Sequence, residues 1–143
     1  MRIDEILRQK GNDVVTIAAD RTVLEAVQVL VERNIGALVV TLRSRPAGIF
    51  TERDVLRLTA RDPGGLGSIE VGNVMTPEPI TATPRDGLSE MMDVMTENRI
   101  RHLPVMDGDR LVGIVSIGDL LNACRFVAEE ENSNLREYIG GVR

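Results

Sequence analysis

The chain has 143 residues, of which 43% are hydrophobic and 27% are charged, and its formal net charge at pH 7 is -5. This size and composition are typical of a soluble globular protein with one domain or two small halves. The acidic charge and the low aromatic content, two Phe and one Tyr, argue against a nucleic-acid partner, because such partners require a basic face or a stacking platform.

The sequence also gives an expected location. No apolar run approaches the roughly 18 residues of a membrane-spanning helix, so no membrane partner is expected. The first five residues include acids and lack the apolar core of a signal peptide. Cys124 is the only cysteine and cannot form an internal disulfide, which suits a reducing compartment. We therefore expect a cytoplasmic protein.

An internal repeat organises the chain. When the sequence is aligned with itself at an offset of 65 residues, positions 16–56 match positions 81–121 without a gap, and 12 of the 41 pairs are identical. One of the identical pairs is Asp54 with Asp119. Two copies of one structural unit are therefore expected.

The first unit begins with a β-rich stretch at residues 14–17. A helix over about residues 23–34 follows, because apolar residues recur there at helical spacing. Thr22 and Glu25 have the spacing of a capping box at its start. The continuous apolar run at residues 36–40 then predicts a buried strand.

A polar turn at residues 43–46 is short enough to join this strand to another at residues 48–50 as a hairpin. Thr51 opens a second helix over residues 52–60. The Pro- and Gly-containing segment 61–68 has no regular pattern and links the halves.

The second unit repeats this order and continues into a C-terminal helix. Its predicted elements are a strand at 80–82, a helix capped by Asp86, strands at 103–106 and 113–115, and a helix opened by Ser116 that runs from Ile117 past Phe126. An acidic helix is expected over residues 128–139, with Leu135, Tyr138 and Ile139 available for packing and with Gly140 and Gly141 ending it.

These elements predict an α/β (α+β) fold, in which two β-α-β-β-α units pack sheet to sheet about a pseudo-twofold axis. The expected domains are a first unit at residues 1–60, a linker at 61–70, a second unit at 71–127, and a C-terminal helical extension at 128–143.

The strand-to-helix junctions at residues 48–54 and 113–119 are the most informative segments. Each begins with a glycine, which lets another group approach the strand closely. Thr51 or Ser116 can cap a helix start, where free N–H groups and the helix dipole favour an anion. Asp54 or Asp119, three residues later, offers acceptors suited to the two hydroxyls of a ribose.

An alternative interpretation applies to the same residues. Thr-x-x-Asp and Ser-x-x-Asp before an apolar helix are also ordinary N-capping patterns. The residues alone leave capping and nucleotide binding both open.

The repeat, the order of elements and the paired Gly-h-h-[Thr/Ser]-x-x-Asp junctions, where h is apolar, resemble a CBS-domain pair, or Bateman module. The resemblance runs from about Ile3 to Ala128, and Met75-Thr76-Pro77 matches the family's Met-Thr-Pro lead-in. It implies a stand-alone pair of CBS domains. It also implies two clefts between the domains that bind adenosine ligands such as AMP, ADP, ATP, S-adenosylmethionine or NAD(H).

The resemblance also implies roles for individual residues. Asp54 and Asp119 would hold ribose hydroxyls, and Thr51 and Ser116 would help to bind phosphate. The adenine would lie near residues 16–17 and Ala37 in one cleft, or near 81–82 and His102 in the other. The expected nucleotide-binding residues are Thr16, Ile17, Gly36, Ala37, Thr51, Arg53, Asp54, Thr81, Arg99, Arg101, His102, Pro104, Ser116 and Asp119.

The two halves are not equivalent. The second has Arg99-Ile100-Arg101-His102 where the first has Asn34-Ile35-Gly36-Ala37. Since a guanidinium suits phosphate, Arg101 is the first candidate for a phosphate ligand and Arg53 the second. The alternative is that these arginines face solvent or pair with acids. Pro104 has no counterpart in the first half, where small Gly36 and Ala37 would admit a dinucleotide.

The function we expect is regulatory: sensing of the cell's energy or redox state through AMP, ADP, ATP or NAD(H), passed to an unknown regulated protein by a conformational change. A homodimer is expected, and neither a catalytic cofactor nor a metal site is expected. His102 lacks an accompanying nucleophile, so we do not expect an enzyme.

Two other functions stay open. One is a nucleotide-hydrolysing or redox enzyme, in which Asp54 and Asp119 hold a magnesium–phosphate complex. The sequence has neither a Walker-type loop nor a Gly-x-Gly-x-x-Gly motif to support it. The other is an interaction scaffold with no ligand.

Overall fold

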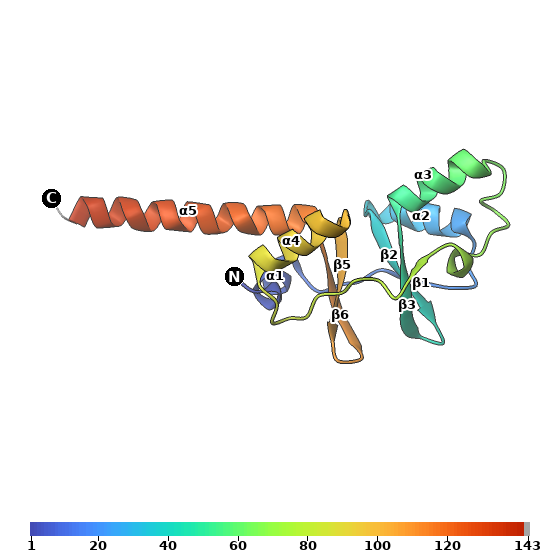
Figure 1. Cartoon of the computed structure of the whole chain (residues 1–143), viewed down its shortest axis with the longest axis horizontal. Coiled ribbons are helices and arrows are strands. Elements are labelled where there is room, and N and C mark those ends of the chain that lie inside the picture. Colours follow the sequence, from blue (N-terminus) through green and yellow to red (C-terminus); the bar gives the residue numbers. More distant parts are fainter. Residues whose placement is uncertain (142–143) are drawn as a thin grey trace. The chain divides into compact units, whose positions relative to one another are not determined.

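The structure is a computed structural model that describes residues 1–141, with side chains as far as residue 136 (Figure 1). The chain forms two compact units. The central unit comprises residues 13–80, and the terminal unit comprises residues 1–12 together with the chain from residue 81 onward. Each unit has its own hydrophobic core. The mixture of helices and sheets confirms the predicted α/β (α+β) class.

The central unit contains a four-stranded sheet in the order β1-β2-β3-β4. Strands β1 and β2 are parallel, whereas β2–β3 and β3–β4 are antiparallel. Its elements are β1 (Thr16–Ala18), α2 (Val23–Arg33), β2 (Ala37–Leu42), β3 (Arg45–Thr51), α3 (Glu52–Arg61), the 3-10 helix η1 (Val71–Asn73) and β4 (Thr76–Pro77). The predicted hairpin and both predicted helices are therefore confirmed.

The terminal unit is built on the antiparallel hairpin of β5 and β6. Its elements are α1 (Ile3–Lys10), α4 (Leu88–Asn98), β5 (His102–Asp107), β6 (Arg110–Ser116) and α5 (Ile117–Gly141). Both α1 and α4 pack against α5, and the remainder of α5 extends past them (Figure 1).

The strand predicted at residues 80–82 is reduced to an isolated parallel bridge between Ala82 and Val105. The cause lies in β5. In the central unit the Val39 N–H donates a hydrogen bond to the Val15 carbonyl, with N···O 3.3 Å. Pro104 occupies the matching position and has no N–H to donate, so the pairing cannot extend as far.

The lead-in of each repeat, the segment that precedes it in the sequence, belongs to the compact unit of the other repeat. Helix α1 precedes the first repeat, yet it packs in the terminal unit, where the Ile3 N–H donates to the Asp86 carbonyl (2.9 Å). Segment η1–β4 precedes the second repeat, yet β4 pairs with β3 in the central unit. The compact units thus change over at residues 12/13 and 80/81, whereas the sequence repeats were delimited at residues 1–60 and 71–127.

The junction glycines lie where these lead-ins approach the sheets. A Cβ on Gly113 would be 2.7 Å from Leu7 Cδ2, and one on Gly48 would be 2.5 Å from Met75 Sδ and 2.7 Å from the Thr76 carbonyl oxygen. The group that approaches each strand is therefore the lead-in segment of the protein itself.

Thr22 is confirmed as the N-cap of α2, whereas the predicted Asp86 cap is wrong. The Thr22 hydroxyl accepts the Glu25 N–H (3.1 Å), but the Glu25 carboxylate pairs with Arg21 (3.1 Å), so only half of the predicted capping box is present. Asp86 does not cap α4, because the N-cap is Gly87, one residue later. The Asp86 carboxylate instead accepts the Thr83 N–H (2.7 Å) and stabilises the preceding turn.

The two helices predicted at the C-terminus form one continuous helix, α5. It includes Gly140 and Gly141, which were expected to end it. Leu135 is 57% exposed, and the side chains of Tyr138 and Ile139 lie outside the described residues. Within residues 1–141, no helix has both the length and the apolar character needed to cross a membrane.

Candidate functional site

The central junction, residues 48–54, ends in a capping box at the start of α3. The Asp54 N–H donates to Thr51 Oγ1 (3.4 Å), and Asp54 Oδ2 accepts the Thr51 N–H (2.9 Å). The Thr51 hydroxyl lies 3.2 Å from the same carboxylate oxygen. These contacts stabilise a helix start that would otherwise leave its first N–H groups without partners.

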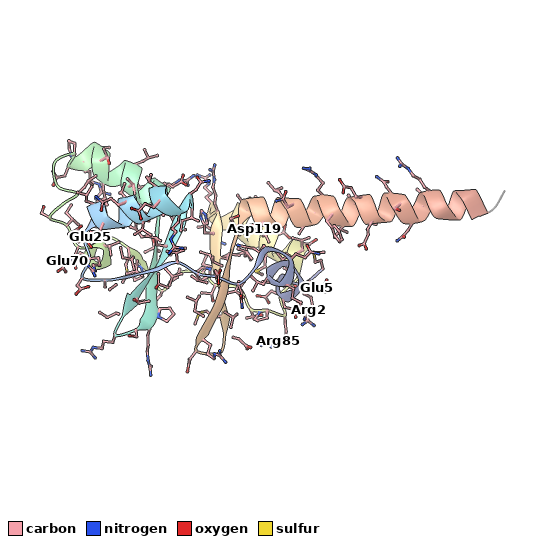
Figure 2. All side chains as sticks on the ribbon, turned by 180° about the vertical axis from the view of Figure 1, so that it is seen from behind. Arg2, Glu5, Glu25, Glu70, Arg85 and Asp119 are labelled. Atoms are coloured by element: carbon pink, nitrogen blue, oxygen red, sulfur yellow. The ribbon has the colours of Figure 1, made fainter. Side chains whose placement is uncertain are left out.

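The terminal junction, residues 113–119, repeats this geometry at the start of α5. Figure 2 labels Asp119 at this helix start. The Asp119 N–H donates to Ser116 Oγ (3.1 Å), and Asp119 Oδ2 accepts the Ser116 N–H (2.8 Å). Both aspartates therefore act as caps, as the alternative interpretation held. Capping uses Oδ2 of each carboxylate, so a ligand that bonds to Oδ1 is compatible with it.

Lys10 distinguishes the terminal junction from the central one. Its ammonium Nζ lies 2.7 Å from Asp119 Oδ2 and 2.6 Å from the Ile114 carbonyl oxygen. The Lys10 side chain is 30% exposed and that of Asp119 is 23% exposed. Lys10 is the last residue of α1, which the buried Ile3 and Ile6 fix in the core of the terminal unit.

The ion pair affects the titration of Asp119. Partial burial of the carboxyl raises its pKa, but the hydrogen bond and charge of Lys10 and the hydrogen bonds from Ser116 lower it more strongly. The net result is an Asp119 pKa below its usual value. The Asp119 carboxylate therefore stays ionised to a lower pH than an ordinary aspartate does.

The central lead-in offers no cation at the matching position. Met75 packs against the central core, and its sulfur approaches Gly48 as Leu7 approaches Gly113 in the terminal unit. Met75 therefore corresponds to Leu7 in this packing, and Glu78, three residues after Met75, corresponds to Lys10. Sequence reasoning missed Lys10 because the repeat was compared only from residue 16.

The structure brings three predicted residues of the central unit to its junction. Ala37 lies opposite Thr51 in the β2–β3 register, and the Gly36 carbonyl accepts the Glu52 N–H (3.0 Å). Arg53 lies exposed in the first turn of α3. On β1, Thr16 is exposed, whereas the Ile17 side chain is buried in the core.

The terminal unit has a matching group. His102 lies opposite Ser116 in the β5–β6 register, and the carbonyl of exposed Arg101 accepts the Ile117 N–H (2.8 Å). Arg99 is the C-cap of α4, with a left-handed φ of 54°. Pro104 is buried, and Thr81 is exposed beside the Ala82 bridge.

We also searched the described residues for a metal site. No group of three or more His, Cys, Asp or Glu side chains among residues 1–136 is placed to hold a metal ion.

Comparison with known families gives a match over nearly the whole chain. The model of the CBS domain matches residues 3–61 and again residues 71–125. The mitochondrial CBS domain-containing protein CBSX3 of Arabidopsis thaliana is 38% identical, over 97% of this chain and 72% of that protein.

Solved structures give the same result. A CBS-domain containing protein from Agrobacterium tumefaciens is 36% identical, with a TM-score of 0.83 over 86% of this chain and 98% of that one. A CBS domain protein from Pyrobaculum aerophilum, solved in complex with AMP, is 28% identical, with a TM-score of 0.74 over 83% of this chain and 89% of that one.

Proposed function

The chain belongs to the CBS-domain family as a tandem pair of CBS domains, and from this premise we propose that it is a regulatory module that binds adenine nucleotides. The ligands we propose are AMP, ADP, ATP or NAD(H). The observation that carries the proposal is the hydroxyl and carboxylate arrangement that recurs at both strand-to-helix junctions, in Thr51 with Asp54 and in Ser116 with Asp119.

The chemistry of each junction suits a nucleotide. The first N–H groups of α3 and α5 and the positive ends of the helix dipoles favour a phosphate. The carboxylate of Asp54 or Asp119 can accept the two hydroxyls of a ribose. The relative from Pyrobaculum aerophilum, solved with AMP, supports the ligand class.

The neighbouring residues suggest how the two sites would differ. Arg101 is adjacent to His102, which lies opposite Ser116, so we propose its guanidinium as a phosphate ligand in the terminal unit. Gly36 and Ala37 leave little side-chain bulk beside Thr51. We propose that the central site accepts the larger ligand, a dinucleotide.

Regulation would follow from conformational linkage. A bound nucleotide can shift the protein between conformations only through its different affinity for them. We propose that a partner protein senses this change, in the cytoplasm, and that the module performs no reaction of its own.

We also propose a homodimer. Val31 on α2 is 74% exposed and Leu56 on α3 is 71% exposed. Large apolar side chains that are this exposed are often covered by a second copy.

The test is thermal and urea unfolding with and without AMP, ATP or NADH. A ligand at 100 times its Kd should stabilise the protein by about 2.7 kcal/mol. Asp119→Ala and Arg101→Ala should each weaken AMP binding and leave the fold intact. Unchanged affinity in both variants would remove the terminal site from the proposal.

The scaffold is the second candidate, because both capping boxes are complete without a ligand. No stabilisation by any of these nucleotides at millimolar concentration would favour it. An enzyme would instead consume ATP or NADH, which a turnover assay detects directly.

A further inference from the structure

The Lys10 ammonium is placed to act on more than Asp119. An ammonium has three N–H donors, and two of them meet Asp119 Oδ2 and the Ile114 carbonyl. The third is available to an acceptor on a ligand beside the carboxylate. In addition, Lys10 compensates the charge of Asp119, which would otherwise repel any anion that approaches the start of α5.

The packing of the lead-in does not require this charge. An apolar side chain contacts the strand glycine in both units, Met75 at Gly48 and Leu7 at Gly113. Lys10, three residues after Leu7, reaches the terminal junction with its charged end, whereas the residue three after Met75 is the acidic Glu78. The lysine thus supplies a cation that the central lead-in lacks at this position.

We propose that Lys10 is a specificity-determining residue, which makes the terminal junction select ligands that carry phosphate over the uncharged nucleoside. This inference rests on the proposed function and deepens it. The phosphate gains one charge-assisted hydrogen bond and is relieved of the repulsion from Asp119. The Asp54 junction obtains no such preference from its lead-in, because residues 71–80 contain no Lys or Arg.

The experiment measures the affinities of adenosine and ADP at each junction separately. Amide NMR titrations would follow Ser116 and Asp119 for the terminal junction, and Thr51 and Asp54 for the central one. In Lys10→Met, the preference for ADP over adenosine at the terminal junction should fall about tenfold, the size of one charged hydrogen bond. The preference at the central junction should not change.

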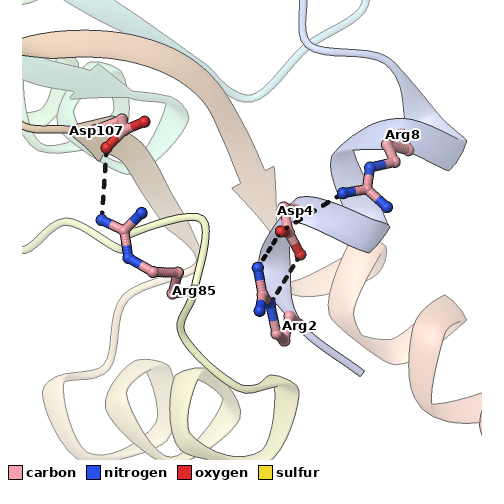
Figure 3. Close-up of polar contacts among 5 residues, drawn as sticks. All are labelled: Arg2, Asp4, Arg8, Arg85 and Asp107. Atoms are coloured by element: carbon pink, nitrogen blue, oxygen red, sulfur yellow. Dashed lines mark hydrogen bonds and ion pairs between the residues drawn. The ribbon is translucent and has the colours of Figure 1, made fainter.

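Matched variants separate this effect from others. Arg8→Met removes a cation from the same helix, but Arg8 contacts Asp4 (3.7 Å) instead of Asp119, so the preference should stay as in the wild type (Figure 3). Lys10→Arg should retain it, because the charge is kept. Lys10→Gln should lose it, and this variant serves if the methionine variant does not fold.

The outcomes are distinct. An unchanged preference in Lys10→Met and Lys10→Gln overturns the inference, and so does an equal loss of adenosine and ADP affinity, which indicates a structural role. If neither compound shifts Ser116 or Asp119 of the wild type, this inference fails. If AMP, ATP and NADH also shift no junction amide, the proposed function fails as well.

Discussion

The central and terminal junctions have the same capping box, but different side chains border them. Lys10 brings an ammonium to Asp119, whereas the lead-in beside Asp54, residues 71–80, contains no Lys or Arg. The backbone geometry is therefore a property of the repeat, while the electrostatics of each copy depend on the lead-in that packs beside it.

The largest expected effect is in the cores. Leu38 and Leu103 are equivalent and fully buried. Leu38→Ala and Leu103→Ala should each lower the free energy of unfolding by about 3 kcal/mol, because each leaves a cavity. Urea unfolding measures both. A loss below about 1 kcal/mol in one variant would show that its unit contributes little to the stability of the chain.

The junction glycines should differ in their tolerance of a methyl group. In Gly48→Ala the added Cβ would meet a backbone oxygen, Thr76 O, at 2.7 Å, whereas in Gly113→Ala it would meet the flexible end of Leu7 at 2.7 Å. We expect a loss of about 2–3 kcal/mol for the first and about 1 kcal/mol for the second.

The same urea unfolding experiment orders the two glycine variants. Equal losses would mean that Leu7 is held as firmly as the backbone at Thr76. A larger loss in Gly113→Ala would contradict the prediction.

Asp119 should make stability depend on acid pH. Its pKa is below the usual 3.8 in the folded protein, so its stabilisation is complete above pH 3.8 and is lost as the pH falls through the folded pKa. Asp119→Asn should therefore be less stable than the wild type at pH 6, by about 1 kcal/mol as for the loss of a cap. The difference should shrink below pH 3.8.

Unfolding free energies of both proteins between pH 6 and pH 3 give this result. Lys10→Met is the control, because removal of the ammonium should move the loss of stability toward higher pH. A wild-type advantage that persists unchanged to pH 3 would contradict the assignment.

The smallest effect concerns Pro104. Pro104→Val would restore the N–H that Val39 uses to bond Val15. The bridge at Ala82 should then extend toward a strand like β1, with a change in stability below about 1 kcal/mol. Hydrogen exchange should show a protected amide at residue 104, and fast exchange there would contradict the explanation of the missing strand.

The repeat and the local patterns predicted most of the fold. Alternating turns and apolar runs located β2, β3, β5 and β6, and the hydroxyl residues Thr51 and Ser116 located the starts of α3 and α5. These features depend on hydrogen bonds between residues close in sequence, and a single sequence contains that information.

Two features could not be predicted in the same way: the packing of each lead-in in the compact unit of the other repeat, and the role of Lys10. The contact between Lys10 and Asp119 joins residues 109 positions apart, and no local pattern in α1 indicates which sheet it covers. The prediction that Asp86 caps α4 failed for a different reason, since a carboxylate near a helix start can equally close the turn before it. Nonlocal packing decided the first case, and a hydrogen bond across three residues, from the Thr83 N–H, decided the second.

Because each lead-in packs in the compact unit of the other repeat, the chain cannot be cut between its repeats without separating packed elements. A cut in the loop between α3 and η1 would give an N-terminal fragment without β4 and with the apolar face of α1, formed by Ile3, Ile6 and Leu7, deprived of its core. The complementary fragment would lack α1. Neither fragment could be expected to fold alone, and co-expression of the two would be needed to reconstitute the native protein.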